Sequence, residues 1–173
     1  MSVEPTTATA AACSPTMRVV TPGTAADEKA AAVHTVLEQL PEWFGVAEWR
    51  SYYADNARAL TMLLACDNAG PVGVLTLRGH YTVHAEIDVL GIVPRFHGTG
   101  LGRRLIASAC DTARANGASY LSVKTVAESQ PDPFYERTRK FYRAVGFKDF
   151  EQIDNHWGDG MDCLVLLQPL KPA

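Results

Sequence analysis

The chain has 173 residues, 47% of them hydrophobic and 20% charged, which is enough to bury the core of one globular domain. Its 16 Lys and Arg against 19 Asp and Glu give a net charge of −3, which argues against a broad electrostatic surface for nucleic acid or membranes. No apolar run approaches the length of a membrane span, and the four cysteines are widely separated, so we expect a cytoplasmic protein without a disulfide framework or metal site.

The first 16 residues are rich in Ala, Thr, Ser and Pro, and Glu4 is their only charged residue. They lack the basic start and the long apolar region of a signal peptide. We therefore predict a disordered tail over residues 1–16 and a single domain over residues 17–173.

Hydrophobic periodicity and turn residues divide this domain into eleven elements. In chain order, we expect a strand at 17–21, helices at 24–39 and 47–57, strands at 60–66, 72–78 and 84–93, a helix at 101–116, a strand at 120–126, a helix at 133–146, and strands at 147–153 and 163–168. Thr24 and Asp132 are the residues that we expect to cap the first and last helices.

A glycine-rich loop, His-Gly-Thr-Gly-Leu-Gly at 97–102, separates an apolar strand from a helix. Glycines at alternate positions allow close approach to the backbone, and the helix start offers unpaired N–H groups, so the loop is a candidate phosphate site. It lacks the Gly-Lys-Ser/Thr ending of a Walker loop and the G-x-G-x-x-G spacing of a dinucleotide fold.

This loop resembles the Gln/Arg-x-x-Gly-x-Gly/Ala signature of the GNAT superfamily of N-acetyltransferases. Arg95-x-x-Gly98-x-Gly100 matches it literally, whereas His97-x-x-Gly100-x-Gly102 has His where Gln or Arg is usual. We prefer the second register because its last glycine adjoins the helix. The resemblance covers residues 17–170. It implies an α/β (α+β) fold with a mixed, mostly antiparallel, V-shaped sheet of about seven strands, flanked by about four helices.

The resemblance also implies acetyl-CoA as the co-substrate. Its pyrophosphate would bind the loop and its pantetheine arm would pair with the preceding strand, through Leu90, Gly91, Ile92, Val93, His97, Gly98, Thr99, Gly100, Leu101, Gly102 and Arg103. Glycine inside a strand marks a bulge or a close approach, so we expect the strand to bulge at Gly91, although a plain irregularity remains an alternative.

His84, Glu86 and Asp88 alternate along the strand before the loop, so they share one face. A protonated amine must lose a proton before it attacks a thioester, which calls for a general base. Glu86 matches the acidic position of the family, and Asp88 and His84 are the alternative candidates for the general base. A solvated strand face without a catalytic role is the competing interpretation.

The segment Phe141-Tyr142-Arg143-Ala144-Val145-Gly146-Phe147 resembles the Phe-Tyr-x-x-x-Gly-Phe segment of the family, whose tyrosine can protonate the departing thiolate. We therefore expect Tyr142 to act as general acid, with simple packing as the alternative. Seven residues earlier the family often has Asn, and this chain has Tyr135.

The aromatic-rich region 43–53 lies where the family covers its acceptor site, so Trp43 and Phe44 join His84 and Asp88 as candidate acceptor contacts. The resemblance implies direct acetyl transfer to a primary amine in a ternary complex, and we favour a small-molecule acceptor. A protein N-terminal or lysine acetyltransferase, a non-catalytic acyl-CoA-binding or sensing module, and a homodimeric assembly remain open alternatives. We expect no nucleic acid, membrane or metal partner.

Overall fold

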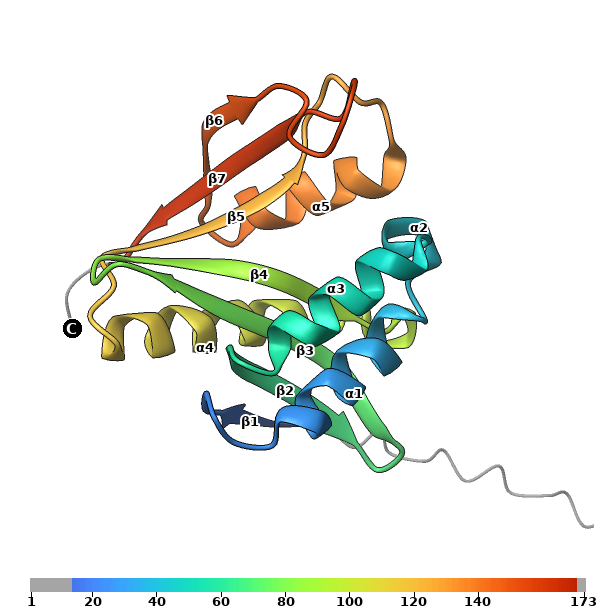
Figure 1. Ribbon diagram of the computed structural model, residues 1–173, viewed down its shortest axis with the longest axis vertical. Coiled ribbons are helices and arrows are strands. Elements are labelled where there is room, and N and C mark those ends of the chain that lie inside the picture. The colour runs from blue at the N-terminus through green and yellow to red at the C-terminus, as the bar shows by residue number, and fades with distance from the viewer. Residues whose placement is uncertain (1–13, 171–173) are drawn as a thin grey trace, which may run out of the picture.

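The computed structural model describes residues 14–170, which form one seven-stranded sheet with helices on both faces (Figure 1). The elements are β1 (Thr16–Val20), α1 (Ala26–Leu37), α2 (Pro41–Phe44), α3 (Ala47–Ala57), β2 (Thr61–Asp67), β3 (Gly70–His80), β4 (His84–Ile92), η1 (Pro94–Phe96), α4 (Leu101–Ala115), β5 (Tyr120–Val126), α5 (Pro133–Ala144), β6 (Lys148–Ile153) and β7 (Cys163–Pro169). The sheet order is β1-β2-β3-β4-β5-β7-β6, and every neighbouring pair is antiparallel except β4 and β5. The predicted mixed sheet of seven strands is confirmed.

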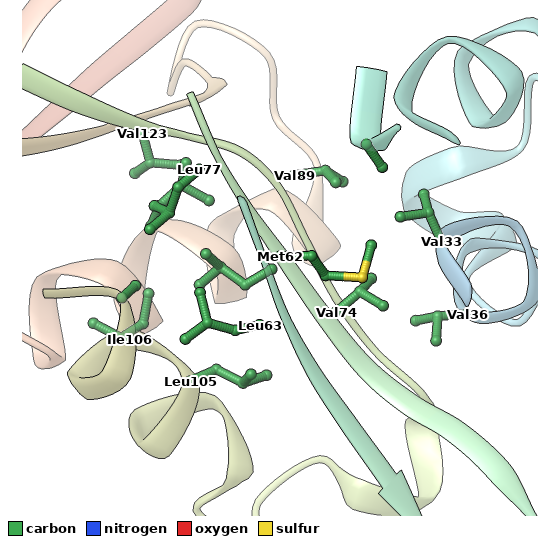
Figure 2. Packing of buried hydrophobic residues seen from close by; sticks show 14 of the residues in the cluster. Val33, Val36, Met62, Leu63, Val74, Leu77, Val89, Leu105, Ile106 and Val123 are labelled. Carbon is green, nitrogen blue, oxygen red and sulfur yellow. The ribbon is translucent and has the colours of Figure 1, made fainter. Parts of the chain in front are cut away.

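Two layers of side chains hold the β1–β4 part of the sheet between its helices. On one face Met62 and Val74 pack towards Val36 of α1, and on the other Leu63 packs towards Leu105 of α4 (Figure 2). All five side chains are fully buried. Successive strand residues point to opposite faces, so β2 supplies both layers from adjacent positions.

The sheet splits between β4 and β5. These strands pair only from His84 with Tyr120 to Ile87 with Val123. Beyond this point β4 continues along β3, while β5 continues along β7, and the two halves separate into the arms of a V (Figure 1). The predicted V shape therefore follows from a parallel pairing that ends after four residues.

The expected bulge at Gly91 is wrong, because the irregularity of β4 lies at Asp88. Ile87 pairs with Leu77 and Val89 pairs with Thr76, which leaves Asp88 as the extra residue. One added residue reverses the alternation of side chains. Val89 therefore turns towards α1 (Figure 2), although simple alternation along β4 predicts that it shares a face with Ile87.

Gly91 has another explanation, which is the close packing of α1. It pairs regularly with Val74. A Cβ at this position would lie 2.9 Å from Leu37 Cδ2, 3.1 Å from Val36 Cγ1 and 3.3 Å from Leu40 Cδ1. The glycine thus allows α1 to lie directly on β4.

The helix starts agree with the sequence at one site and differ at another. The Asp132 carboxylate accepts hydrogen bonds from the amides of Phe134 (2.8 Å) and Tyr135 (3.0 Å), so the predicted cap of α5 is confirmed. The predicted Thr24 cap of α1 is wrong. Ala25 occupies the N-cap position with no side-chain bond, and the Thr24 hydroxyl donates instead to the Thr21 carbonyl oxygen at 2.9 Å.

The predicted tail lies outside the described residues up to position 13, and β1 begins at Thr16. Cys66, Cys110 and Cys163 are free thiols, and Cys13 also lies outside the described part. Within residues 14–170, no helix combines the length and the hydropathy that a bilayer span requires.

The packing at Gly91 predicts a position-specific stability loss. Gly91→Ala should lower the free energy of unfolding by about 1–3 kcal/mol, because the new methyl group overpacks three side chains of α1 and its C-terminal end. Gly79→Ala in β3 is the control, since a Cβ there meets nothing within 4 Å. Urea unfolding measures both variants. Equal stabilities for the two would show that Gly91 does not hold α1 against the sheet.

Candidate active site

A cavity of about 640 Å³ lies between the arms of the V. Its wall draws on α2, α3, β4, the glycine loop, β5, α5 and the loop before β7. Twelve of the predicted site residues line it: Trp43, Phe44, Asp88, Leu90, Gly91, Ile92, His97, Gly98, Gly100, Gly102, Arg103 and Tyr142. Five others lie nearby without forming part of the wall: His84, Glu86, Val93, Thr99 and Leu101.

The glycine loop presents open backbone amides to this cavity. Gly98 and Gly100 have φ angles of +74° and +87°, and a Cβ at either position would meet nothing within 4 Å. Within residues 14–170, no backbone carbonyl accepts a hydrogen bond from the amides of Gly98, Gly100, Leu101 or Gly102. These donors and the positive end of the α4 dipole converge on one place, which suits an anionic group.

The third glycine of the loop has a packing role. A Cβ at Gly102 would lie 3.0 Å from two atoms of the Phe141 ring and 3.3 Å from Ile92 Cδ1. Gly102 therefore lets α4 begin close to α5 and the end of β4.

The two loop registers place their first residues differently. The Arg95 guanidinium pairs with the Asp67 carboxylate at 2.9 Å, away from the cavity wall. The His97 ring lies in the wall, and its Nε2 is 2.7 Å from the carbonyl oxygen of Ile92. This geometry favours the His97 register.

One edge of β4 faces the cavity. From Asp88 onward the strand has no pairing with β5, so the backbone groups on that edge are unpaired with any described strand. Leu90, Gly91 and Ile92 all line the cavity along it. An extended ligand with amide groups could therefore pair with this edge as an added strand would.

Glu86 lies behind the cavity wall with both carboxylate oxygens engaged. Oε1 accepts from Lys124 Nζ at 2.7 Å, and Oε2 lies 2.8 Å from His80 Nε2. Its side chain is only 12% exposed. Burial raises the pKa of Glu86, but the hydrogen bonds and charges of Lys124 and His80 outweigh it and hold the pKa below its usual value. Glu86 is therefore ionised at neutral pH.

Asp88 is the member of the predicted trio that reaches the cavity. Its side chain is 8% exposed and pairs with Arg78 Nη2 at 2.7 Å. His84 instead turns to Ser122, with 2.7 Å between Nε2 and Oγ. Burial, followed by the neighbouring His80, lowers the pKa of His84. The structure thus brings all three residues together at the apex of the V, which is the place where β4 and β5 pair.

Tyr142 combines a buried ring with a hydroxyl group at the cavity. The residue is 5% exposed, and its ring packs edge-on against Phe147 with the centroids 5.5 Å apart. Burial and then the neighbouring Tyr53 raise its pKa, so the phenol stays protonated at neutral pH. Among residues 14–170, none is hydrogen-bonded to the Tyr142 hydroxyl, which leaves this proton free for a ligand.

Trp43 joins α2 to α5 above the cleft. Its Nε1 donates to Thr138 Oγ1 at 3.0 Å, and its carbonyl oxygen accepts from the Tyr135 hydroxyl at 3.2 Å. The guanidinium of Arg137 lies 5.6 Å from the Trp43 ring centroid. Tyr135, which replaces the family's usual Asn, thus serves to hold α2 in place.

Sequence reasoning missed Lys124, Arg137 and Thr138, all of which line the cavity. No local pattern marks Lys124, because its contact with Glu86 depends on the register of β4 and β5. The helical spacing of Tyr135 and Thr138 places them on one face of α5 and was the available signal for Thr138. No group of three or more His, Cys, Asp or Glu residues within 14–170 could hold a metal ion.

Many solved structures share this fold, among them two GNAT-family proteins and an aminoglycoside acetyltransferase. A GNAT-family protein from Desulfovibrio desulfuricans aligns with a TM-score of 0.74 at 18% identity, over 91% of this chain and 99% of that one. A GNAT acetyltransferase from Elizabethkingia anophelis with acetyl-CoA bound gives 0.66 at 18% identity, over 91% and 99%. The aminoglycoside 6'-N-acetyltransferase from Enterococcus faecium gives 0.70 at 12% identity, over 91% and 98%.

No curated protein matches the chain in sequence. A sequence model described as the acetyltransferase (GNAT) family matches residues 30–147, which is more than half of the chain. This match includes β4, the glycine loop, α4, β5 and α5, which together build most of the cavity. The chain belongs to the acetyltransferase (GNAT) family.

Proposed function

We propose that this protein transfers an acetyl group from acetyl-CoA to a primary amine of a small molecule, by direct attack in a ternary complex. The observation that carries the proposal is the split of β4 from β5. The glycine loop, the unpaired edge of β4 and the buried carboxylate of Asp88 all lie along the one cavity that this split leaves open. The acetyl-CoA-bound relative from Elizabethkingia anophelis and the aminoglycoside acetyltransferase from Enterococcus faecium support this class of reaction.

The residues present fit the coenzyme at three points. The amides of Gly98 and Gly100 would bind the pyrophosphate, and Arg103, which directly follows the loop, adds a positive charge in the wall. The free edge of β4 from Leu90 to Ile92 would pair with the pantetheine amides. The thioester would then lie near the apex of the V, where β4 and β5 meet.

Transfer forms a bond between the amine nitrogen and the carbonyl carbon, and it breaks the bond between that carbon and sulfur. The amine must release a proton, and the departing thiolate must gain one. We assign the first proton to Glu86, through a bridging water because Glu86 lies behind the wall, with Asp88 as the direct competitor. We assign the second to the free hydroxyl of Tyr142.

The glycine loop predicts a specific thermal response. Acetyl-CoA at about 100 times its Kd should stabilise the folded chain by about 2.7 kcal/mol, which differential scanning fluorimetry detects as a higher Tm. Gly100→Trp should abolish the shift by covering the loop amides. Gly23→Trp is the control, because its φ of +77° imposes similar strain far from the cavity. A folded Gly100→Trp variant with the full shift would disprove the loop assignment.

The role of Tyr142 predicts a loss confined to turnover. Tyr142→Phe should lower kcat by about 10²-fold, since it removes a proton donor and keeps the ring. The acetyl-CoA thermal shift should not change, and the exposed Tyr120→Phe should leave kcat unaltered. If kcat is unchanged while chemistry limits the rate, Tyr142 only packs.

The base assignment predicts a pH effect. Glu86→Gln should lower the rate at neutral pH by roughly 10²-fold and remove the acidic limb of kcat/KM, with partial recovery at high pH where the amine is already neutral. Because the pKa of Glu86 is lowered, the wild-type limb should lie below the usual Glu value of about 4.3. Asp88→Asn should have the smaller effect. If Asp88→Asn or His84→Ala removes the limb and Glu86→Gln keeps it, the base is another residue of β4.

A further inference from the structure

Part of the cavity lining consists of four aromatic residues and a methionine, which we call the aromatic wall: Phe44, Trp49, Tyr53, Trp157 and Met161. Phe44 comes from α2 and the next two residues from α3, while the last two come from the loop between β6 and β7. This loop belongs to the arm opposite the glycine loop (Figure 1). The members of the aromatic wall thus come from separate segments, and none of them belongs to the glycine loop that we propose for the pyrophosphate.

The aromatic wall is incompletely covered. Trp49 is 43% exposed and Met161 is 40% exposed, although both are large apolar side chains at a cavity. Phe44 and Tyr53 already pack edge-on against each other, with their centroids 5.8 Å apart. A ligand with a hydrophobic ring would remove this remaining apolar surface from water, which is favourable.

The charges of the cavity restrict the ligand further. Asp88 is the single carboxylate among the described residues of the wall, and Arg78 already pairs with it. Lys124, Arg103 and Arg137 add positive charge. One ammonium group could share the Asp88 carboxylate with Arg78, whereas further ammonium groups would find no second carboxylate in the described part of the wall.

We propose that the acceptor is a primary monoamine with an aromatic or similar hydrophobic ring, an arylalkylamine in chemical class. The inference rests on the proposed function and names its substrate. A polycationic sugar is disfavoured, because burying each unpaired ammonium group is costly and the wall offers no second carboxylate. A peptide is disfavoured for a related reason, since burying its backbone polar groups against a mostly apolar wall is costly wherever they lack a hydrogen-bond partner.

The test measures thiol release from acetyl-CoA with four acceptors: 2-phenylethylamine, ethylamine, kanamycin and an alanine-terminated tetrapeptide. The value of kcat/KM for 2-phenylethylamine should exceed that for ethylamine by roughly 10- to 100-fold, the gain expected from burying one ring. It should also exceed the values for kanamycin and the peptide. A preference for kanamycin or for the peptide would overturn the inference and leave the acetyltransferase proposal standing.

A matched pair of variants tests whether the preference for a ring depends on the aromatic wall. Trp49→Ala should lower kcat/KM for 2-phenylethylamine by about tenfold, mainly through KM, and change the value for ethylamine by less than about twofold. Tyr52→Ala should change neither value, because Tyr52 lies beside Trp49 on α3 but does not line the cavity. Equal losses for both amines in Trp49→Ala would show that Trp49 does not contact the ring.

The failure of the proposed function gives a different result. In that case acetyl-CoA binds but releases no thiol with any of the four amines, or acetyl-CoA does not bind at all. Either outcome would remove the inference together with the proposed function.

Discussion

The pairing between β4 and β5 ends early, and the cavity, the free edge of β4 and the position of Asp88 all follow from that. Four residue pairs hold the two halves of the sheet together, and the strands then diverge. A continuous pairing would fill the space that is now the cavity and would satisfy the edge of β4. The bulge at Asp88 lies directly after the last pair, so the same point turns a carboxylate towards the cavity.

This apex also concentrates charge in a poorly solvated place. Glu86 pairs with Lys124 across β4 and β5, and Asp88 pairs with Arg78 across β4 and β3. A mostly buried carboxylate without a partner is strongly unfavourable, so each pair makes its acidic group tolerable there. The pKa of Glu86 is lowered for the same reason, because the hydrogen bonds and charges of Lys124 and His80 outweigh the effect of burial. The apex is thus rich in polar groups and close to neutral.

Local signals in the sequence predicted what depends on neighbours along the chain. The seven strands follow from apolar periodicity and turn residues. The cap of α5 follows from Asp132 before Pro133, and the open conformation of the loop follows from Gly98 and Gly100. Two local signals failed. The Thr24 hydroxyl bonds a preceding carbonyl group while Ala25 takes the cap position, and the bulge expected at Gly91 lies at Asp88.

Backbone preferences over a few residues were thus enough to predict the order of the seven strands and four long helices and the glycine loop before α4, although they did not predict the short helices α2 and η1. The reason why Gly91 is glycine became visible only in the folded molecule, since it is the packing of a helix more than fifty residues earlier in the chain. Only the tertiary structure decided that Lys124 meets Glu86 and that Asp88 alone of the β4 trio lines the cavity. Those facts depend on strand register and on a one-residue bulge, and both are set by packing between distant segments rather than by local residue preference.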